Sequence, residues 1–266
     1  MVTVGFLLGR ASLVGDRGPV DRSMSSAKGK EISSLARGGD YAHAGEVEAV
    51  DLVFDEVGKD PNRRMLDVGC GRGGTAWYLY RGGYGLVQGL DADAVSIAYA
   101  RSRYAPLDFR CHNALDCARQ YRGTFEVIYL FNVLYLFAPP DQLRCLRQLR
   151  RLADQRSVLV LFDYTTWTPD GRTGSAYRSH WYPIEIAGFP DMSTAGGWRI
   201  AEFVDYSSHF GKWYAAMLGK LHDRHDAIVE IADEAWFDAA KRIYESHLEG
   251  IESGRLGGGV YYLRPG

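Results

Sequence analysis

A glycine-rich run near position 70 has the clearest chemical pattern in the chain. It reads Met65-Leu66-Asp67-Val68-Gly69-Cys70-Gly71-Arg72-Gly73-Gly74, an apolar strand followed by a loop that leads into a helix near Thr75. Glycines at positions 69, 71 and 74 permit a sharp turn, and the free N–H groups at the helix start can face a ligand. The run therefore predicts a loop that binds a nucleoside cofactor.

Asp91 is the second part of this pattern. It follows the next apolar segment and lies 17 residues after Gly74, where a carboxylate can accept both hydroxyls of a ribose. Asp67, two residues before Gly69, would repel a pyrophosphate and better suits a cationic amino group. The two carboxylates thus favour S-adenosylmethionine (SAM), whose methionyl ammonium and sulfonium are positive, over NAD.

Short apolar runs alternate with helical segments around this loop, which is typical of parallel βαβ units. An amphipathic helix is predicted from Glu46, with Gly58 at its C-cap. A long helical insertion, roughly 207–250, is predicted between the last two strands. The predicted strands are Arg64–Val68, Leu86–Leu90, Leu107–His112, Phe125–Phe131, Ser157–Asp163, Arg199–Asp205 and Gly258–Leu263. The pattern predicts an α/β fold with a seven-stranded Rossmann-like sheet and helices on both of its faces.

The chain divides into four segments on this interpretation. Residues 1–23 are expected to be an irregular leader, with Met24 as an alternative start, and residues 24–45 a cap over the cofactor. Residues 46–163 are expected to be the cofactor-binding core. Residues 164–266 should hold an aromatic-rich lid and the last two strands with their helical insertion. The aromatic stretch either covers a planar or cationic substrate or packs as an ordinary subdomain.

Length, composition and charge narrow the function classes. The 266 residues are 46% hydrophobic and 24% charged, which is typical of a globular chain with a full core. The net charge of −2 provides no positive field for nucleic acid, and no segment near the start is long enough to span a membrane. Four cysteines without a CxxC pair or zinc spacing favour a reducing, cytoplasmic compartment and predict no disulfides.

Three motifs resemble the class I SAM-dependent methyltransferases: the LDVGCGRGG run, the GLD that ends at Asp91, and the FEVIYLF strand. The resemblance covers roughly residues 41–163. It implies the methyltransferase form of the sheet described above, with SAM as cofactor and its methionyl part near the first loop. The positions that it assigns to cofactor binding are Tyr41, Asp67, Gly69, Cys70, Gly71, Asp91, Ala92, Asn113, Ala114, Leu115 and Phe131.

A narrower similarity links the chain to phosphoethanolamine-type amine methyltransferases. The lead-in 39–46 and the Asp163-Tyr164 pair match that branch. The sequence departs from it in two places. Tyr135 stands where the branch has a catalytic histidine, and the segment GIESGRLGGG lacks the lysine cluster expected near a phosphate.

Candidate catalytic residues are those expected at the carboxyl ends of the strands, where ligands bind in open α/β sheets. They are His43, Tyr135, Asp163 and Tyr164, and methyl transfer needs no metal. His180 has no predicted role, and Arg178 with Tyr182 either meets an anionic group or pairs at the surface. His222 and His225, one helical turn apart, are interpreted as an exposed helix rather than a metal site.

The predicted function is SAM-dependent methyl transfer to a small molecule, at an amine or a hydroxyl group. A protein of this fold that binds SAM for a non-methylating or regulatory role is the alternative. An NAD oxidoreductase is a third class. Neither nucleic acid nor a membrane is expected as a partner, and the sequence predicts no oligomeric state.

Overall fold

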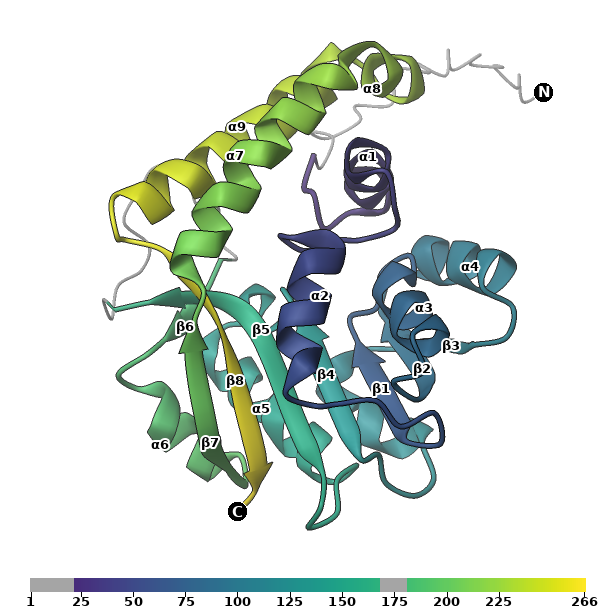
Figure 1. The fold of residues 1–266 in the computed structure, drawn as a ribbon, viewed down its shortest axis with the longest axis vertical. Coiled ribbons are helices and arrows are strands. Elements are labelled where there is room, and N and C mark those ends of the chain that lie inside the picture. Colours follow the sequence, from purple (N-terminus) through teal and green to yellow (C-terminus); the bar gives the residue numbers. More distant parts are fainter. Residues whose placement is uncertain (1–21, 168–180) are drawn as a thin grey trace, which may run out of the picture.

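One mixed sheet organises the chain in the computed structural model, which describes residues 22–167 and 181–266. Its strands run in the order β3-β2-β1-β4-β5-β8-β7, with a short β6 beside β5 (Figure 1). The five strands from β3 to β5 are parallel, whereas β8 is antiparallel to both of its neighbours. The strands are β1 (Arg64–Val68), β2 (Leu86–Asp91), β3 (Asp108–Cys111), β4 (Val127–Phe131), β5 (Val158–Thr166), β6 (Ile184–Glu185), β7 (Trp198–Asp205) and β8 (Gly257–Pro265).

Helices cover both faces of this sheet, and others stand beyond the carboxyl ends of its parallel strands. The α-helices are α1 (Ala27–Arg37), α2 (Glu46–Asp55), α3 (Gly74–Arg81), α4 (Ala94–Arg103), α5 (Pro139–Arg150), α6 (Phe189–Ala195), α7 (Ser207–Asp223), α8 (His225–Ile231) and α9 (Glu234–Glu252). Two 3₁₀ segments, η1 (Ala114–Gln120) and η2 (Leu134–Leu136), follow β3 and β4.

Alternate residues of the buried strands build two cores, one on each face of the sheet. In β1, Met65 packs with α2, α3 and α4, whereas Leu66 and Val68 face the opposite core with α5 and α6. In β5, Phe162 and Leu161 divide between the two cores in the same way. The central strand β4 therefore consists of a continuous apolar run, because both of its faces are buried.

The predicted α/β fold is confirmed, and the predicted bounds of β1 match the structure. Five other predicted strands differ from the structure by one or two residues at their ends, and two larger details of the prediction were wrong. The fifth strand does not end at Asp163, since it continues to Thr166 and stays in register with β8 as far as Thr165. An eighth strand exists, β6, whose two residues are too few to show a period. The helix that begins at Glu46 ends at Asp55, and Gly58 follows it with a φ of 69° and donates its N–H to the Phe54 carbonyl at 3.0 Å, as a capping glycine does.

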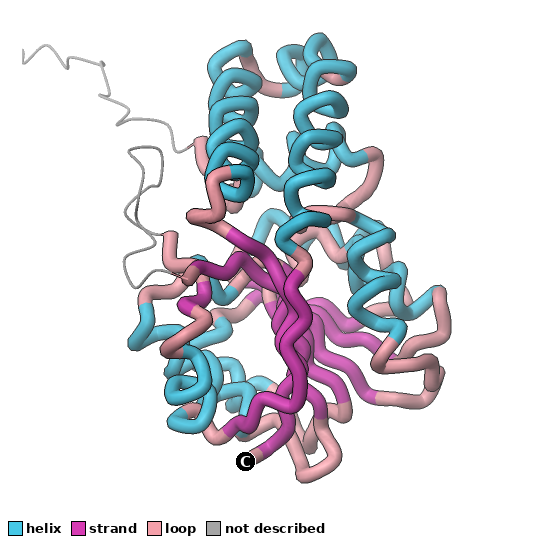
Figure 2. The backbone as a smooth tube through the Cα atoms, turned by 60° about the vertical axis from the view of Figure 1, so that its left-hand side comes forward, coloured by secondary structure: helices cyan, strands magenta, loops and turns pink. Residues whose placement is uncertain are grey.

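A layer of helices lies beyond the carboxyl ends of the parallel strands. Helices α1, α7, α8 and α9 form this layer (Figures 1 and 2). The last three lie between β7 and β8, which confirms the predicted helical insertion. Its parts are joined through polar contacts: Ser33 of α1 bonds Tyr244 of α9 at 3.1 Å. Glu46 of α2 accepts from Lys220 of α7 at 2.8 Å and also pairs with Arg37 of α1.

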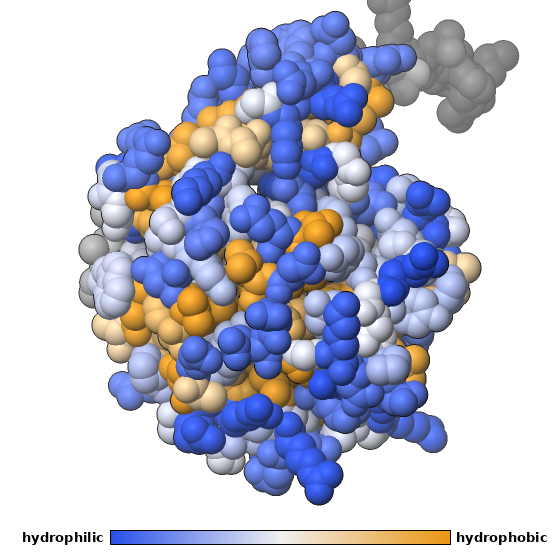
Figure 3. Space-filling model, viewed as in Figure 1, coloured by the Kyte–Doolittle hydropathy of each residue, from blue (hydrophilic) through white to orange (hydrophobic). Residues whose placement is uncertain are grey.

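On the face that Figure 3 shows, hydrophilic residues predominate and hydrophobic ones surface in separate patches. Within residues 22–167 and 181–266, no helix combines the length and apolar character that crossing a membrane requires. The predicted leader, residues 1–23, lies outside the described residues except for its last two positions.

Asp67 is a buried carboxyl in the middle of the sheet. The residue is 2% exposed and is paired in register with Gly89 of β2 and Tyr129 of β4. Its Oδ2 has no hydrogen-bond partner in the part of the chain that the structure describes. Burial raises the pKa of Asp67 to about 8. The folded chain therefore holds this proton at a pH where the unfolded chain has lost it.

This proton predicts a pH dependence of stability. Because the folded pKa is raised, the Asp67 contribution to the free energy of unfolding falls as pH rises from about 4 to about 8. The Asp67→Asn variant does not titrate there. Its free energy of unfolding relative to wild type should therefore rise by about 1–3 kcal/mol between pH 5.5 and 7.5 in urea titrations. The exposed Asp238→Asn change is the control, and a constant Asp67→Asn difference would contradict the prediction.

Candidate cofactor and acceptor site

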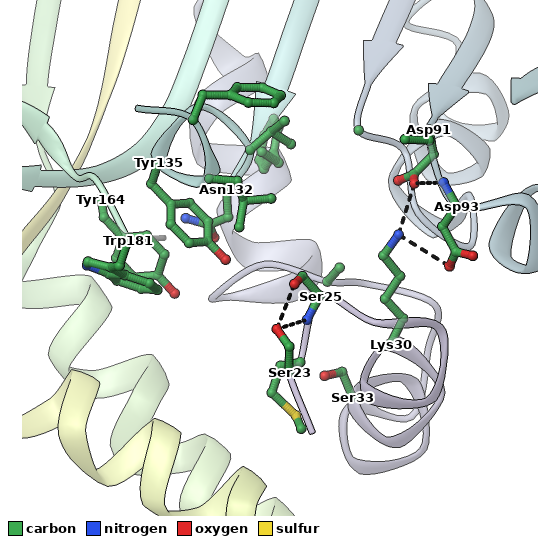
Figure 4. A pocket seen from close by; sticks show the side chains of 18 of the residues that line it. Ser23, Ser25, Lys30, Ser33, Asp91, Asp93, Asn132, Tyr135, Tyr164 and Trp181 are labelled. Carbon is green, nitrogen blue, oxygen red and sulfur yellow. Dashed lines mark hydrogen bonds and ion pairs between the residues drawn. The ribbon is translucent and has the colours of Figure 1, made fainter. Parts of the chain in front are cut away.

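A cavity of about 600 Å³ lies between the carboxyl ends of β1, β2, β4 and β5 and the helices α1 and α9. Its volume suits a cofactor together with a small molecule. Figure 4 shows that its lining falls into two regions, with Asp91 and Asp93 on one side and Tyr135, Tyr164 and Trp181 on the other. We call the first region the cofactor end. The acceptor chamber is the second region, lined by Tyr135, Tyr164, Trp181, Tyr214, Tyr244 and His247.

The glycine loop closes the cofactor end because its backbone folds against neighbouring strands. Gly69 has a φ of 80°, and a Cβ there would lie 2.3 Å from Val133, so only glycine fits. Gly71 has a φ of 52°, yet a Cβ there would meet no atom closer than 3.9 Å. The packing at Gly71 therefore leaves room for a methyl group, with Ala42 and Lys30 as neighbours, while the turn at Gly69 is fixed by packing.

Asp91 ends β2 and is fully engaged by the protein. Its Oδ2 accepts the Gly71 N–H at 2.8 Å, and its Oδ1 accepts the Asp93 N–H at 2.9 Å. The Lys30 ammonium of α1 lies 3.0 Å from the same Oδ1 and 3.6 Å from Asp93 (Figure 4). A ribose that uses both Asp91 oxygens must take the place of Lys30.

The segment after β3 completes the cofactor end. Asn113 and Ala114 line the cavity, and the Asn113 side chain accepts the Leu115 N–H at 2.9 Å, which starts η1. His112 lines the cavity as well and contacts Asp116 at 2.9 Å. Since the Asn113 oxygen is occupied by this cap, backbone groups of the segment are left to meet an adenine.

Asn132 follows β4 and lines the cavity beside Tyr135 (Figure 4). It has a φ of 54°, a conformation that asparagine tolerates better than most residues. Its Oδ1 accepts the Ala44 N–H at 3.3 Å, but its Nδ2 is buried without a partner among the described residues. A buried donor without a partner is costly, and a bound ligand would satisfy it.

Aromatic rings wall the acceptor chamber. Trp181 lies 4.4 Å from Tyr135 and 4.6 Å from Tyr164, measured between ring centroids. The hydroxyls of Tyr164 and Tyr214 bond each other across β5 and α7. Burial raises the pKa of Tyr135 and of Tyr164 well above the ordinary tyrosine value, so both phenols stay protonated.

Asp163 acts through the backbone beneath this chamber. It is 1% exposed, and its Oδ2 accepts the N–H groups of Val133, Leu134 and Tyr135 at 2.7–3.3 Å, while Oδ1 accepts that of Tyr164 at 2.8 Å. Burial raises the pKa of Asp163 to about 7, and these four N–H bonds oppose the rise. Asp163 does not line the cavity; it fixes the loop that carries Tyr135.

His43 also lies outside the cavity. Its Nε2 contacts the Thr75 hydroxyl at 2.9 Å and its Nδ1 contacts the Ala44 carbonyl at 3.0 Å, which attaches the lead-in to the start of α3. Burial lowers the pKa of His43 to about 4, so the ring is neutral at pH 7. Of the four candidate catalytic residues, the structure brings Tyr135 and Tyr164 to the cavity and places His43 and Asp163 behind its wall.

The residues predicted to bind the cofactor also divide into those that line the cavity and those that do not. Gly69, Asp91, Ala92, Asn113, Ala114 and Phe131 line the cavity. Tyr41, Asp67, Cys70, Gly71 and Leu115 are not among its lining residues, although the Gly71 N–H holds Asp91 in place. Arg178 and His180 lie outside the described residues. In the described part of the chain, no cluster of three or more His, Cys, Asp or Glu side chains is placed to hold a metal.

Sequence reasoning missed the residues that α1 and α9 bring to the cavity. They are Lys30, Ser33, Arg37, Tyr244 and His247. The spacing of residues 30, 33 and 37 could have indicated the three residues of α1, because this interval places side chains on one face of a helix. The aromatic stretch divides in the structure: Trp181 and Tyr214 line the chamber, whereas Phe189 and Phe203 pack against Tyr261 on the far face of the sheet.

These observations fit SAM as a ligand. The cavity offers a carboxylate on β2, the glycine turn at Gly69 and an unsatisfied amide at Asn132. A cationic ligand would also favour ionisation of the buried Asp67 beneath the loop.

Comparison with known proteins supports this interpretation. A family model described as a methyltransferase domain matches residues 65–155. No curated protein sequence matches the chain. Among solved structures, the cyclopropane synthase MmaA2 of Mycobacterium tuberculosis has a TM-score of 0.78 at 13% identity, with 94% of this chain and 99% of that chain covered.

Two further structures widen the range of chemistry on this fold. Phosphoethanolamine N-methyltransferase 2 of Haemonchus contortus, solved with phosphomonomethylethanolamine and S-adenosylhomocysteine (SAH), has a TM-score of 0.77 at 14% identity and covers 92% of this chain. This chain spans only 58% of that protein. The [4+2]-cyclase SpnF has a TM-score of 0.73 at 18% identity, covering 90% of this chain and 93% of that one. This chain thus contains a methyltransferase domain and has the fold of the class I SAM-dependent methyltransferases, whose cofactor is SAM.

Proposed function

We propose that this chain transfers the methyl group of SAM to a small-molecule acceptor, at an amine or a hydroxyl group. The observation that carries the proposal is the single cavity that joins the cofactor end to the acceptor chamber. A cavity of this kind holds two reactants side by side, which is the main requirement for a direct transfer. Bound SAM would supply an electrophilic methyl group.

The residues of the chain divide the remaining work. Asp91 would accept the ribose hydroxyls, the segment from Asn113 to Leu115 would meet the adenine, and Gly69 with Asn132 would meet the methionyl part. Tyr135 and Tyr164 would orient the acceptor and exclude water from it. We assign positioning roles to Asp163, which holds the backbone of Tyr135, and to His43, which holds the lead-in.

One observation favours a second candidate, a protein that binds SAM without methylating anything. The structural neighbour SpnF is described as a cyclase, so the fold also serves other chemistry. The two candidates differ in turnover.

The proposed activity is tested with SAM that carries a radiolabelled methyl group. Incubation with panels of amines and phenols should move label into an acceptor, together with one equivalent of SAH. Calorimetry with SAH should show binding, with NAD as the control ligand. If SAH binds and no acceptor gains label, the non-methylating candidate replaces the proposal.

Asp91→Ala should weaken SAH binding. The variant removes the carboxylate that we assign to the ribose, and loss of a charged hydrogen-bond acceptor costs about 1–3 kcal/mol. Calorimetric titration measures the change, and Asp108→Ala, which removes an exposed carboxylate of β3, is the control. Equal affinity in the Asp91→Ala variant would show that the ribose lies elsewhere.

Lys30→Met should strengthen SAH binding. In the free protein the Lys30 ammonium occupies the Asp91 oxygen that a ribose needs, so its removal abolishes a competing ion pair. We expect the free energy of SAH binding to become more favourable by about 0.5–1 kcal/mol. Added salt should raise the affinity of the wild type, because it screens the ion pair, and this salt effect should be absent in the variant. The matched control is Lys28→Met on the same helix, since Lys28 pairs with Glu31 instead. Weaker binding by the Lys30→Met variant would mean that Lys30 contacts the cofactor directly.

A further inference from the structure

The acceptor chamber differs from the cofactor end in its charge. The cavity's two carboxylates among the described residues, Asp91 and Asp93, are both at the cofactor end and both face Lys30. Beside the acceptor chamber the charged lining residue is Arg37, whose side chain is 2% exposed. Its partner Glu46 is shared with Lys220, so two cations are balanced by one carboxylate.

This charge balance disfavours a cationic acceptor. Aromatic faces attract cations, but Arg37, whose guanidinium carbon lies 5.8 Å from the centroid of the Tyr244 ring, repels them. The Asp163 carboxyl beneath the chamber is engaged by four backbone N–H groups. A neutral planar molecule gains from the same rings by stacking and meets no opposing charge. The chamber is thus better suited to an uncharged aromatic ring than to an ammonium group.

His247 of α9 brings a hydrogen-bonding side chain to the chamber. The residue is 6% exposed and lines the cavity, and its Nδ1 is buried with no partner in the described residues. Its ring stacks on Trp181 at 4.6 Å with an interplanar angle of 29° and lies 5.1–5.3 Å from the rings of Tyr214 and Tyr164.

The surroundings of His247 also fix its form. Burial, and then the charge of Arg37, lower the pKa of His247 to about 3, so the ring is neutral at pH 7. A neutral imidazole has one nitrogen that accepts a hydrogen bond. The hydroxyls of Tyr164, Tyr214 and Tyr244 already form hydrogen bonds, in the Tyr164–Tyr214 and Ser33–Tyr244 pairs.

We propose that the acceptor chamber binds an uncharged aromatic molecule of the phenol class, whose hydroxyl group donates a hydrogen bond to an imidazole nitrogen of His247. The inference rests on the proposed function, because it names the acceptor of the same cavity. Stacking on Trp181 and the neighbouring tyrosines would hold the ring, and His247 would fix the direction of the hydroxyl.

The test compares phenol with toluene, which has the same shape and no donor. Calorimetry on the full-length protein, with and without saturating SAH, should give phenol an affinity about threefold to tenfold higher than toluene. His247→Phe keeps a ring and removes both nitrogens. In this variant the phenol preference should disappear while toluene binding remains. Tyr244→Phe is the control, since it alters the same chamber and should keep the preference.

Several results would overturn the inference. Equal affinity of phenol and toluene in the wild type, or a phenol preference that survives His247→Phe, would show that His247 does not receive the hydroxyl. Tighter binding of benzylammonium than of phenol would assign the chamber to a cation. None of these titrations requires methyl transfer. The protein could show the phenol preference that depends on His247 and yet fail to bind SAH. That combination would refute the proposed function and leave this inference standing.

Discussion

The carboxylate of Asp163 is the constraint on which the site depends. It lies inside β5, in register with Gly259 of β8, and its two oxygens accept four backbone N–H groups from β5 and from the loop after β4. Those bonds fix Val133, which fills the space over Gly69, and Tyr135, which walls the acceptor chamber. A buried carboxyl is tolerated here because its hydrogen bonds replace water. One side chain of the core thereby sets the distance between the two regions of the cavity.

The helical layer supplies walls of the acceptor chamber that the sheet does not provide. The carboxyl ends of parallel strands provide a glycine turn and an acid at the cofactor end, as they do throughout open α/β sheets. The acceptor chamber, by contrast, is completed by α1, α7 and α9, which stand above the sheet in Figure 1. Neighbours on the same fold are described as acting on amines and as forming rings, so the sheet alone does not decide the acceptor. Side chains of the helical layer must make that choice.

The sequence predicted the part of the site that depends on local chain geometry. The glycine turn, Asp91 and Asn113 were found because each lies at the carboxyl end of a predicted strand. Arg37 and His247 were not found, because helical periodicity indicates only which side of a helix is buried and not what that side faces. Asp163 and His43 were predicted to be catalytic. Their contacts with backbone and with Thr75 place them behind the wall of the cavity, which spacing in one dimension does not reveal.

Helix α1 contributes to both regions of the cavity at once. Lys30 reaches Asp91 at the cofactor end, and Arg37, two helical turns later on the same face, borders the acceptor chamber. The helix is capped at both ends, by Ser26 and by Gly38, and Arg37 is held by Glu46. A ligand that displaces Lys30 and moves α1 would also move Arg37. Linkage of this kind is reciprocal: whatever factor the first ligand applied to the affinity of the second, the second would apply in return.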